Sequence, residues 1–132
     1  MREITREWLE AANLDLETIP YIIGDDRLTG HVAFHSQQAI EKSLKAVIED
    51  FGQKVPKIHT LQKLFDICSA TISINYDENL IIALDSLYLE SRYPGEFGLL
   101  PNGKPDIKQV ETYYEFAQNI YHTLKQFLEN KL

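Results

Sequence analysis

The sequence has a single cysteine, Cys68, among 132 residues, so no internal disulfide can form and we expect a reducing compartment. No apolar run approaches the roughly 20 residues that a membrane-spanning helix needs. The first residues, Met1-Arg2-Glu3-Ile4, are charged and contain no apolar signal core. We therefore expect a soluble, cytoplasmic protein.

Basic residues are also scarce, because 13 lysines and arginines face 20 acidic residues and the formal charge is −7. This balance argues against a general nucleic-acid binder but leaves room for a local basic pocket. No glycine-rich phosphate loop follows a strand pattern. His31 and His35 are four residues apart, yet no third ligand accompanies them, so we expect no metal and no cofactor.

Helical periodicity and turn residues predict five helical segments within one domain spanning residues 1–132. The segments are 3–19, 28–51, a short helix from 61, 77–92 and 107–129. Gly52 fits a helix end, while Thr60 and Asp106 fit helix starts. Such segments favour an all-α fold, an antiparallel up-and-down helical bundle of four to five helices. The loop 94–105 has three glycines and three prolines, a composition typical of functional loops, and whether it closes over a ligand is open.

The stretch 34–46 is the most informative part of the chain. At about 100° per residue, one face of its helix carries apolar residues. The other face carries imidazole, amide and ammonium groups separated by alanines, a pattern that suggests contact with an anion or another chain. The apolar face comprises Ala33, Ile40, Leu44, Val47 and Phe51, and the polar face His35, Gln38, Ala39, Lys42, Lys45 and Ala46.

Asp15 falls near the middle of the apolar face of the first helix, beside Trp8 and Ile19. A carboxylate there is costly unless it is paired or hydrogen-bonded. The alternative is that the helix ends early or rotates, which would leave Asp15 in water.

The stretch 34–46, the residues around Asp15 and four shorter pieces of the chain together resemble the HEPN (higher eukaryotes and prokaryotes nucleotide-binding) domain family. The matching pieces span about residues 11–94 and follow one another in the order typical of the family. The last helix agrees with the architecture of the family. The resemblance implies a helical bundle that forms a homodimer, binds a nucleotide or RNA, and acts with a minimal nucleotidyltransferase in a toxin–antitoxin-like pair. The matching pieces are Ala11 to Leu16, Phe34 to Ala46, Gly52, Pro56, His59 to Leu61, and Tyr88 to Pro94.

Many proteins of this superfamily are metal-independent ribonucleases with an arginine, four to six further residues and then a histidine. No histidine follows Arg92 at that spacing, and only three residues separate Arg27 from His31. The resemblance therefore favours the nucleotide-binding partner of a nucleotidyltransferase, and leaves enzymatic activity uncertain.

Arg92 is the first candidate ligand-binding residue, because a guanidinium can grip a phosphate through two hydrogen bonds. Tyr88 and Tyr93 flank it with rings able to stack on a base. The alternative is a structural Arg92–Asp15 pair that ties two helices together. Ligand binding and this pair are compatible if Asp15 orients Arg92.

Lys42, Lys45, His35 and Gln38 are candidates for contacts to a phosphate or nucleobase. Their alternatives are a dimer contact or a helix-surface network with Glu41 and Glu49. His59 most simply helps to start the third helix. Cys68 and the tyrosines of the last helix fit a core or an interface.

Three functions remain open on the sequence alone. The first is a nucleotide- or RNA-binding module without catalysis. The second is a divergent ribonuclease in which Arg92 stabilises the charge on phosphorus and His35 or His59 activates the 2′-hydroxyl. The third is a purely structural dimerisation domain.

Overall fold

The computed structural model describes residues 1–91 and 104–131, and this part of the chain contains helices and no strands. Arg92, Tyr93 and residues 94–103 of the predicted loop lie outside the described residues. The predicted all-α helical bundle is confirmed. Its α-helices are α1 (Glu3–Thr18), α2 (Thr29–Asp50), α3 (Leu61–Cys68), α4 (Glu78–Ser91) and α5 (Ile107–Glu129), with short 3-10 turns η1 (Ile19–Tyr21) and η2 (Asp26–Leu28).

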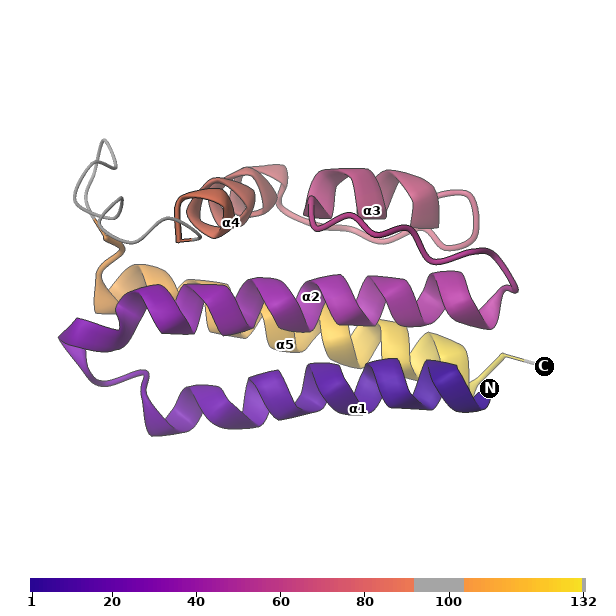
Figure 1. Cartoon of the computed structure of the whole chain (residues 1–132), viewed down its shortest axis with the longest axis horizontal. Coiled ribbons are helices and arrows are strands. Elements are labelled where there is room, and N and C mark those ends of the chain that lie inside the picture. The colour runs from indigo at the N-terminus through magenta and orange to yellow at the C-terminus, as the bar shows by residue number, and fades with distance from the viewer. Residues whose placement is uncertain (92–103, 132) are drawn as a thin grey trace.

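The long helices α1, α2 and α5 lie side by side, and α3 and α4 together cover α2 (Figure 1). α1 and α2 run in opposite directions, and the connection after α2 leads back along that helix. α3 then runs in the same direction as α2, α4 leads back towards the start of α2, and α5 runs parallel to α2. Residues 69–77 connect α3 to α4, and the sequence predicts a loop or a ragged helix end for residues 69–76. Both termini lie at the same end of the bundle, beside the end of α2.

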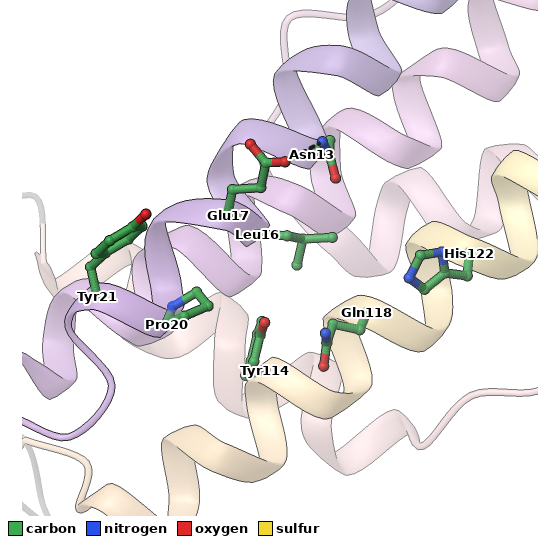
Figure 2. Close-up of a pocket in the computed structure, with 8 residues that line it drawn as sticks. All are labelled: Asn13, Leu16, Glu17, Pro20, Tyr21, Tyr114, Gln118 and His122. Atoms are coloured by element: carbon green, nitrogen blue, oxygen red, sulfur yellow. Dashed lines mark hydrogen bonds between the residues drawn. The ribbon is translucent and has the colours of Figure 1, made fainter.

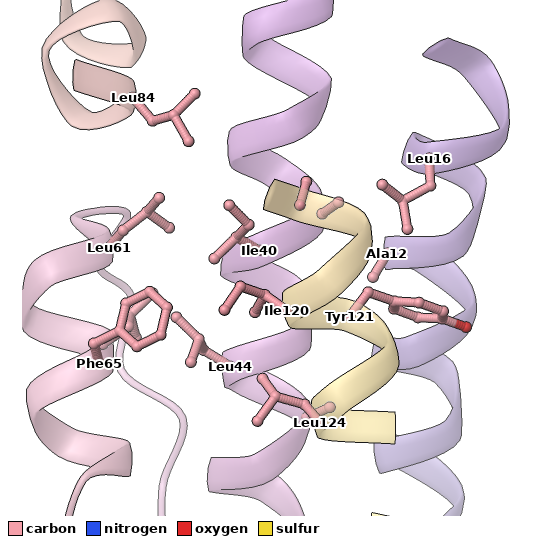
Figure 3. Packing of buried hydrophobic residues seen from close by; sticks show 14 of the residues in the cluster. Ala12, Leu16, Ile40, Leu44, Leu61, Phe65, Leu84, Ile120, Tyr121 and Leu124 are labelled. Atoms are coloured by element: carbon pink, nitrogen blue, oxygen red, sulfur yellow. The ribbon is translucent and has the colours of Figure 1, made fainter. Parts of the chain in front are cut away.

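A continuous apolar core joins all five helices (Figure 3). Ile40 and Leu44 of α2 lie between α3 and α5, and Tyr121 of α5 reaches toward Ala12 and Leu16 of α1. Burial of such side chains removes apolar surface from water and is the main favourable contribution to folding. Cys68 belongs to this core, where burial raises its pKa to about 12, so it is an apolar packing group and not a nucleophile.

Helix α2 is buried on nearly all sides, which differs from the expected division into one apolar and one exposed polar face. Ala39 and Ala46 are fully buried, and Lys45 is nearly so. These alanines belong to the helix side that the sequence assigned to a ligand or another chain. Conversely, Phe51 belongs to the expected apolar face but is 40% exposed, because α2 ends at Asp50 and Phe51 lies beyond that end, where its ring stacks on Phe127.

Two helix starts show how local and distant groups share the capping of backbone N–H groups. Asp106 accepts from the N–H of Gln109, whose side chain returns the hydrogen bond, so the predicted cap is confirmed as a capping box. Thr60 occupies the N-cap position of α3 but makes no side-chain cap. Asp85 of α4 instead accepts from the N–H groups of Leu61 and Gln62, at 2.8 and 3.3 Å.

Asp50, at the end of α2, holds both termini in place. Its carboxylate accepts hydrogen bonds from the backbone N–H of Arg2 at 2.8 Å, the hydroxyl of Thr5 at 3.0 Å and the ammonium of Lys131. Burial opposes ionisation, but these hydrogen bonds outweigh it and lower the pKa of Asp50 to about 2. Gly52 follows with φ +76°, a conformation that ends the helix as expected and brings the backbone against the Arg2 guanidinium.

We expect Asp50→Asn to lower the free energy of unfolding by about 3 kcal/mol, because it leaves Lys131 without its buried counter-charge. Urea denaturation at neutral pH measures this. Asp66→Asn is the matched control, since Asp66 lies exposed on α3 and its substitution should change stability little. Equal effects of the two substitutions would contradict the role of Asp50.

The stabilisation by Asp50 should also depend on pH. Its pKa falls from 3.8 in the unfolded chain to about 2 in the folded protein, so its contribution is complete above about pH 4. The contribution is lost as the pH falls from about 4 to about 2. The difference in unfolding free energy between wild type and Asp50→Asn should therefore shrink over this range, as measured by denaturation at a series of pH values. A constant difference would contradict the low pKa.

Candidate functional site

Asp15 is buried between α1 and α2 and is paired with two residues of α2. The residue is 8% exposed. Its Oδ1 lies 2.8 Å from Nδ1 of His35, and its Oδ2 lies 2.7 Å from Nζ of Lys42. His35 and Lys42 are seven residues apart, two turns along one side of α2, so one carboxylate reaches both. The requirement that a carboxylate here be paired is met within the chain.

Glu41 forms a second buried polar centre on the neighbouring side of α2. Only 3% of the residue is exposed, yet its carboxylate lies 3.1 Å from Nζ of Lys45 and 3.2 Å from Nδ1 of His59. The amides of Gln37 and Gln38 donate to it at 3.2 and 3.4 Å. A buried charge is tolerated when it is paired and its other lone pairs are hydrogen-bonded, as here.

The two glutamines connect this centre to the segment before α3. Gln38 donates to Oε1 of Gln37 at 2.7 Å, and Gln37 donates to the backbone carbonyl of His59 at 2.9 Å. Gln37 is fully buried. Its hydrogen bond to the backbone therefore fixes where His59 lies relative to α2.

A row of four rings links the two polar centres. The ring centroids of His35 and Phe34 are 5.4 Å apart, those of Phe34 and Tyr88 are 6.0 Å apart, and those of Tyr88 and His59 are 5.5 Å apart. Phe34 and Tyr88 are stacked, with 14° between their planes. The row thus has a carboxylate-bound histidine at each end and flat aromatic faces between them.

A hollow of about 210 Å³ opens beside the His59 end of this row, lined by Ile58, His59, Thr60, Asp85, Tyr88 and Leu89. The pKa of Asp85 is raised, mainly by burial and also by the nearby charge of Glu41. The hydrogen bonds that Asp85 accepts from the N–H groups of Leu61 and Gln62 act in the opposite direction. Negative charge is therefore unfavourable here, and a ligand phosphate requires cationic groups.

Hydrogen bonding to carboxylates selects one tautomer of both histidines. An ionised carboxylate only accepts hydrogen bonds, so Nδ1 of His35 and Nδ1 of His59 are the donors to Asp15 and Glu41. In the neutral rings Nε2 is then the basic nitrogen. Each histidine is thereby able to accept a hydrogen bond or a proton at Nε2.

The structure brings most of the predicted residues into one region. Asp15, His35 and Lys42 form the first centre, while Gln38, Lys45 and His59 belong to the second and Tyr88 lies in the ring row. Arg92 and Tyr93 lie outside the described residues. Both carboxylate oxygens of Asp15 bind α2, so the structure supplies two partners other than the Arg92 that the sequence suggested.

Three residues of this region were not among the predicted site residues: Phe34, Gln37 and Glu41. Glu41 was considered only as a partner on the helix surface, and its i,i+4 pair with Lys45 is confirmed, but the pair is buried. The sequence signal for Gln37 and Glu41 is their four-residue spacing. It places two polar groups on the same side of the helix as the apolar residues Ile40 and Leu44.

Comparison with protein-family models identifies a match to the HEPN domain over residues 5–127. The chain belongs to the HEPN family. The match includes nearly all of α1 and α5 and the whole of α2, α3 and α4, so it contains both polar centres and the ring row. The resemblance proposed from the sequence motifs is thereby confirmed at the level of the family.

Among solved structures, the chain is similar to the crystal structure of TT1696 from Thermus thermophilus. The two are 26% identical, with a TM-score of 0.70, and the alignment covers 95% of this chain and 98% of TT1696. A comparison with curated proteins gave no match. In the described part of the chain, no helix has both the length and the apolarity needed to cross a membrane, and no three residues form a metal-binding group.

We expect Asp15→Asn to lower the free energy of unfolding by about 3 kcal/mol, because it leaves Lys42 without its counter-charge in a half-buried site. Combining it with Lys42→Met should recover part of this loss, since the unpaired charge is then removed. Chemical denaturation of the two single variants and the double variant measures the coupling. Glu17→Gln, on the exposed side of the same helix, is the control. Strict additivity of the two substitutions would contradict the pairing.

Proposed function

We propose that this HEPN protein is a nucleotide- or RNA-binding module that acts, as a homodimer, with a minimal nucleotidyltransferase in a toxin–antitoxin-like pair. The ring row between the two carboxylate-bound histidines is the observation that carries the proposal. Aromatic faces stack on nucleobases with little sequence preference, and imidazole nitrogens accept or donate hydrogen bonds at base edges or phosphates.

The charge balance of the region determines which residue would bind the phosphate. Lys42 and Lys45 are each paired with a carboxylate, so their charges are largely neutralised. Arg92 follows the last residue of α4 in the sequence and is four residues beyond Tyr88. In this proposal Arg92 binds the phosphate through its guanidinium fork, and Tyr88 and Tyr93 hold the base.

The homodimer and the nucleotidyltransferase partner rest on membership of the HEPN family and on the sequence motifs that first suggested it. A binding module that acts through a partner enzyme needs no catalytic group of its own. This agrees with the absence of a histidine at ribonuclease spacing after Arg92.

A metal-independent ribonuclease is the second candidate, and one observation favours it. Asp15 anchors Nδ1 of His35, which leaves Nε2 of the neutral ring as a base. In this scheme Nε2 takes the proton of a 2′-hydroxyl, and the 2′-oxygen attacks the adjacent phosphorus to form a 2′,3′-cyclic phosphate. The bond from phosphorus to the 5′-oxygen breaks, the leaving 5′-oxygen takes a proton from water, and Arg92 stabilises the charge that develops on the phosphate.

Calorimetric titration of ATP, GTP and a short single-stranded RNA, with RNA cleavage followed in the same samples, tests these functions. We expect saturable binding by wild type without cleavage. Arg92→Ala should weaken binding about tenfold or more, because a hydrogen-bonded phosphate contact to a charged group is lost. Arg27→Ala is the control, since Arg27 is exposed and paired with its neighbour Asp25.

Cleavage that is lost in Arg92→Ala would replace the binding module with the ribonuclease. Absence of both binding and cleavage in folded wild type would contradict both functions and favour a structural dimerisation domain. Equal losses in Arg92→Ala and Arg27→Ala would show general charge attraction and contradict the placement of the site.

A further inference from the structure

A second hollow of about 560 Å³ lies between α1 and α5 and shares no residue with the ring row or the two polar centres. One wall is formed by Asn13, Glu17 and Tyr21 of α1 and η1, and the other by Tyr114, Gln118 and His122 of α5. Figure 2 shows Leu16 between these walls, with Tyr21 and Pro20 at one end and His122 at the other. We call this hollow the α1–α5 groove.

The groove combines negative charge with exposed aromatic surface. Glu17 accepts a hydrogen bond at 3.2 Å from Asn13 of the same helix, and in the described part of the chain it forms no ion pair with a lysine or arginine. Tyr21 is 90% exposed, so its ring is open to a ligand. Of the lining side chains, only that of His122 is able to carry positive charge.

A second carboxylate extends the negative charge along α1. Glu10 is three residues before Asn13 and seven before Glu17, so the three lie on one side of the helix. The pKa of Tyr121 on α5 is raised by burial and, against the effect of Lys125, also by the charge of Glu10. Glu10 therefore acts on α5 as well, so a second negative charge lies near the groove, on the side of α1 that carries Asn13 and Glu17.

We propose that the α1–α5 groove docks an arginine-bearing segment of a partner protein. A guanidinium stacks on a tyrosine ring and pairs with a carboxylate through two parallel hydrogen bonds, and Tyr21, Tyr114 and Glu17 supply these groups. The amide oxygens of Asn13 and Gln118 accept its remaining N–H groups. The volume suits a side chain with part of its backbone.

The surroundings of the groove favour a polypeptide over a small cation. Leu14 is 54% exposed and lies three residues before Glu17, so it continues the exposed surface of α1 beside Glu17. In a protein-docking surface an anchor side chain enters a central pocket and the residues beside the anchor cover the surrounding surface, which here includes Leu14.

The test is an NMR titration of the protein with the peptide acetyl-Ala-Arg-Ala-Arg-Ala-amide, with the glutamine analogue of that peptide as the ligand control. We expect shifts at Glu17, Tyr21 and Tyr114 for the arginine peptide alone. Glu17→Gln should weaken binding about fivefold, as for an exposed ion pair. Tyr21→Ala should weaken it about threefold through loss of the ring contact. Both residues are exposed, so both variants should fold.

Glu115→Gln is the matched control, because it removes the same charge from an exposed position on α5 that does not line the groove. Equal weakening in Glu17→Gln and Glu115→Gln would show general charge attraction and overturn the proposal, as would no binding of the peptide. Acetyl-arginine-amide binding as tightly as the peptide would show a small-cation site instead. Sedimentation showing self-association that Glu17→Gln abolishes would assign the groove to a second copy of the chain.

Discussion

Two carboxylates buried against helix α2 are the constraint on which the rest of this structure depends. Asp15 and Glu41 are each nearly inaccessible to solvent, and an unpaired carboxylate in such a position would cost several kcal/mol. Each is matched by one lysine and one histidine. α1 must therefore keep the rotation against α2 that brings Asp15 to His35 and Lys42. The segment before α3 must keep the position that brings His59 to Glu41.

This arrangement connects stability to the site. The same contacts that satisfy Asp15 and Glu41 hold His35 and His59 by Nδ1 and place Phe34 and Tyr88 between them. Lys42 and Lys45 form ion pairs with these carboxylates, so the region is polar but has little net positive charge. Such a site selects a ligand through ring stacking and imidazole contacts, and a phosphate must be bound by a residue outside the two pairs.

The α1–α5 groove has the opposite character and faces another part of the surface. It carries the carboxylate of Glu17, which forms no ion pair with a lysine in the described part of the chain, and the exposed ring of Tyr21. The two surfaces share helix α1, because Asp15 and Glu17 lie two residues apart on different sides of that helix.

The sequence was sufficient for the helical bundle, for most helix ends and for the family, because these depend on local periodicity, on capping residues such as Asp106 and on motifs. It also showed that Asp15 needs a partner. It did not identify His35 and Lys42 as the partners, since pairing between helices depends on their relative rotation.

Other failures have the same origin in distant contacts. Glu41 has the surroundings of a surface residue in the sequence and is buried because the chain around His59 covers it. The start of α3 is capped by Asp85, 24 residues beyond Leu61, and not by the adjacent Thr60. Local sequence patterns do not reveal which distant segment covers a helix face.

The most direct test of this account is a long-range ¹H–¹⁵N NMR spectrum of the histidine rings at alkaline pH, where imidazole is neutral, with and without a short RNA. The account predicts that His35 and His59 both carry their proton on Nδ1 and that the Nε2 signals move when RNA is added. Protons on Nε2 in the free protein, or Nε2 signals unaffected by saturating RNA, would contradict the claim that the buried carboxylates present these histidines to a ligand.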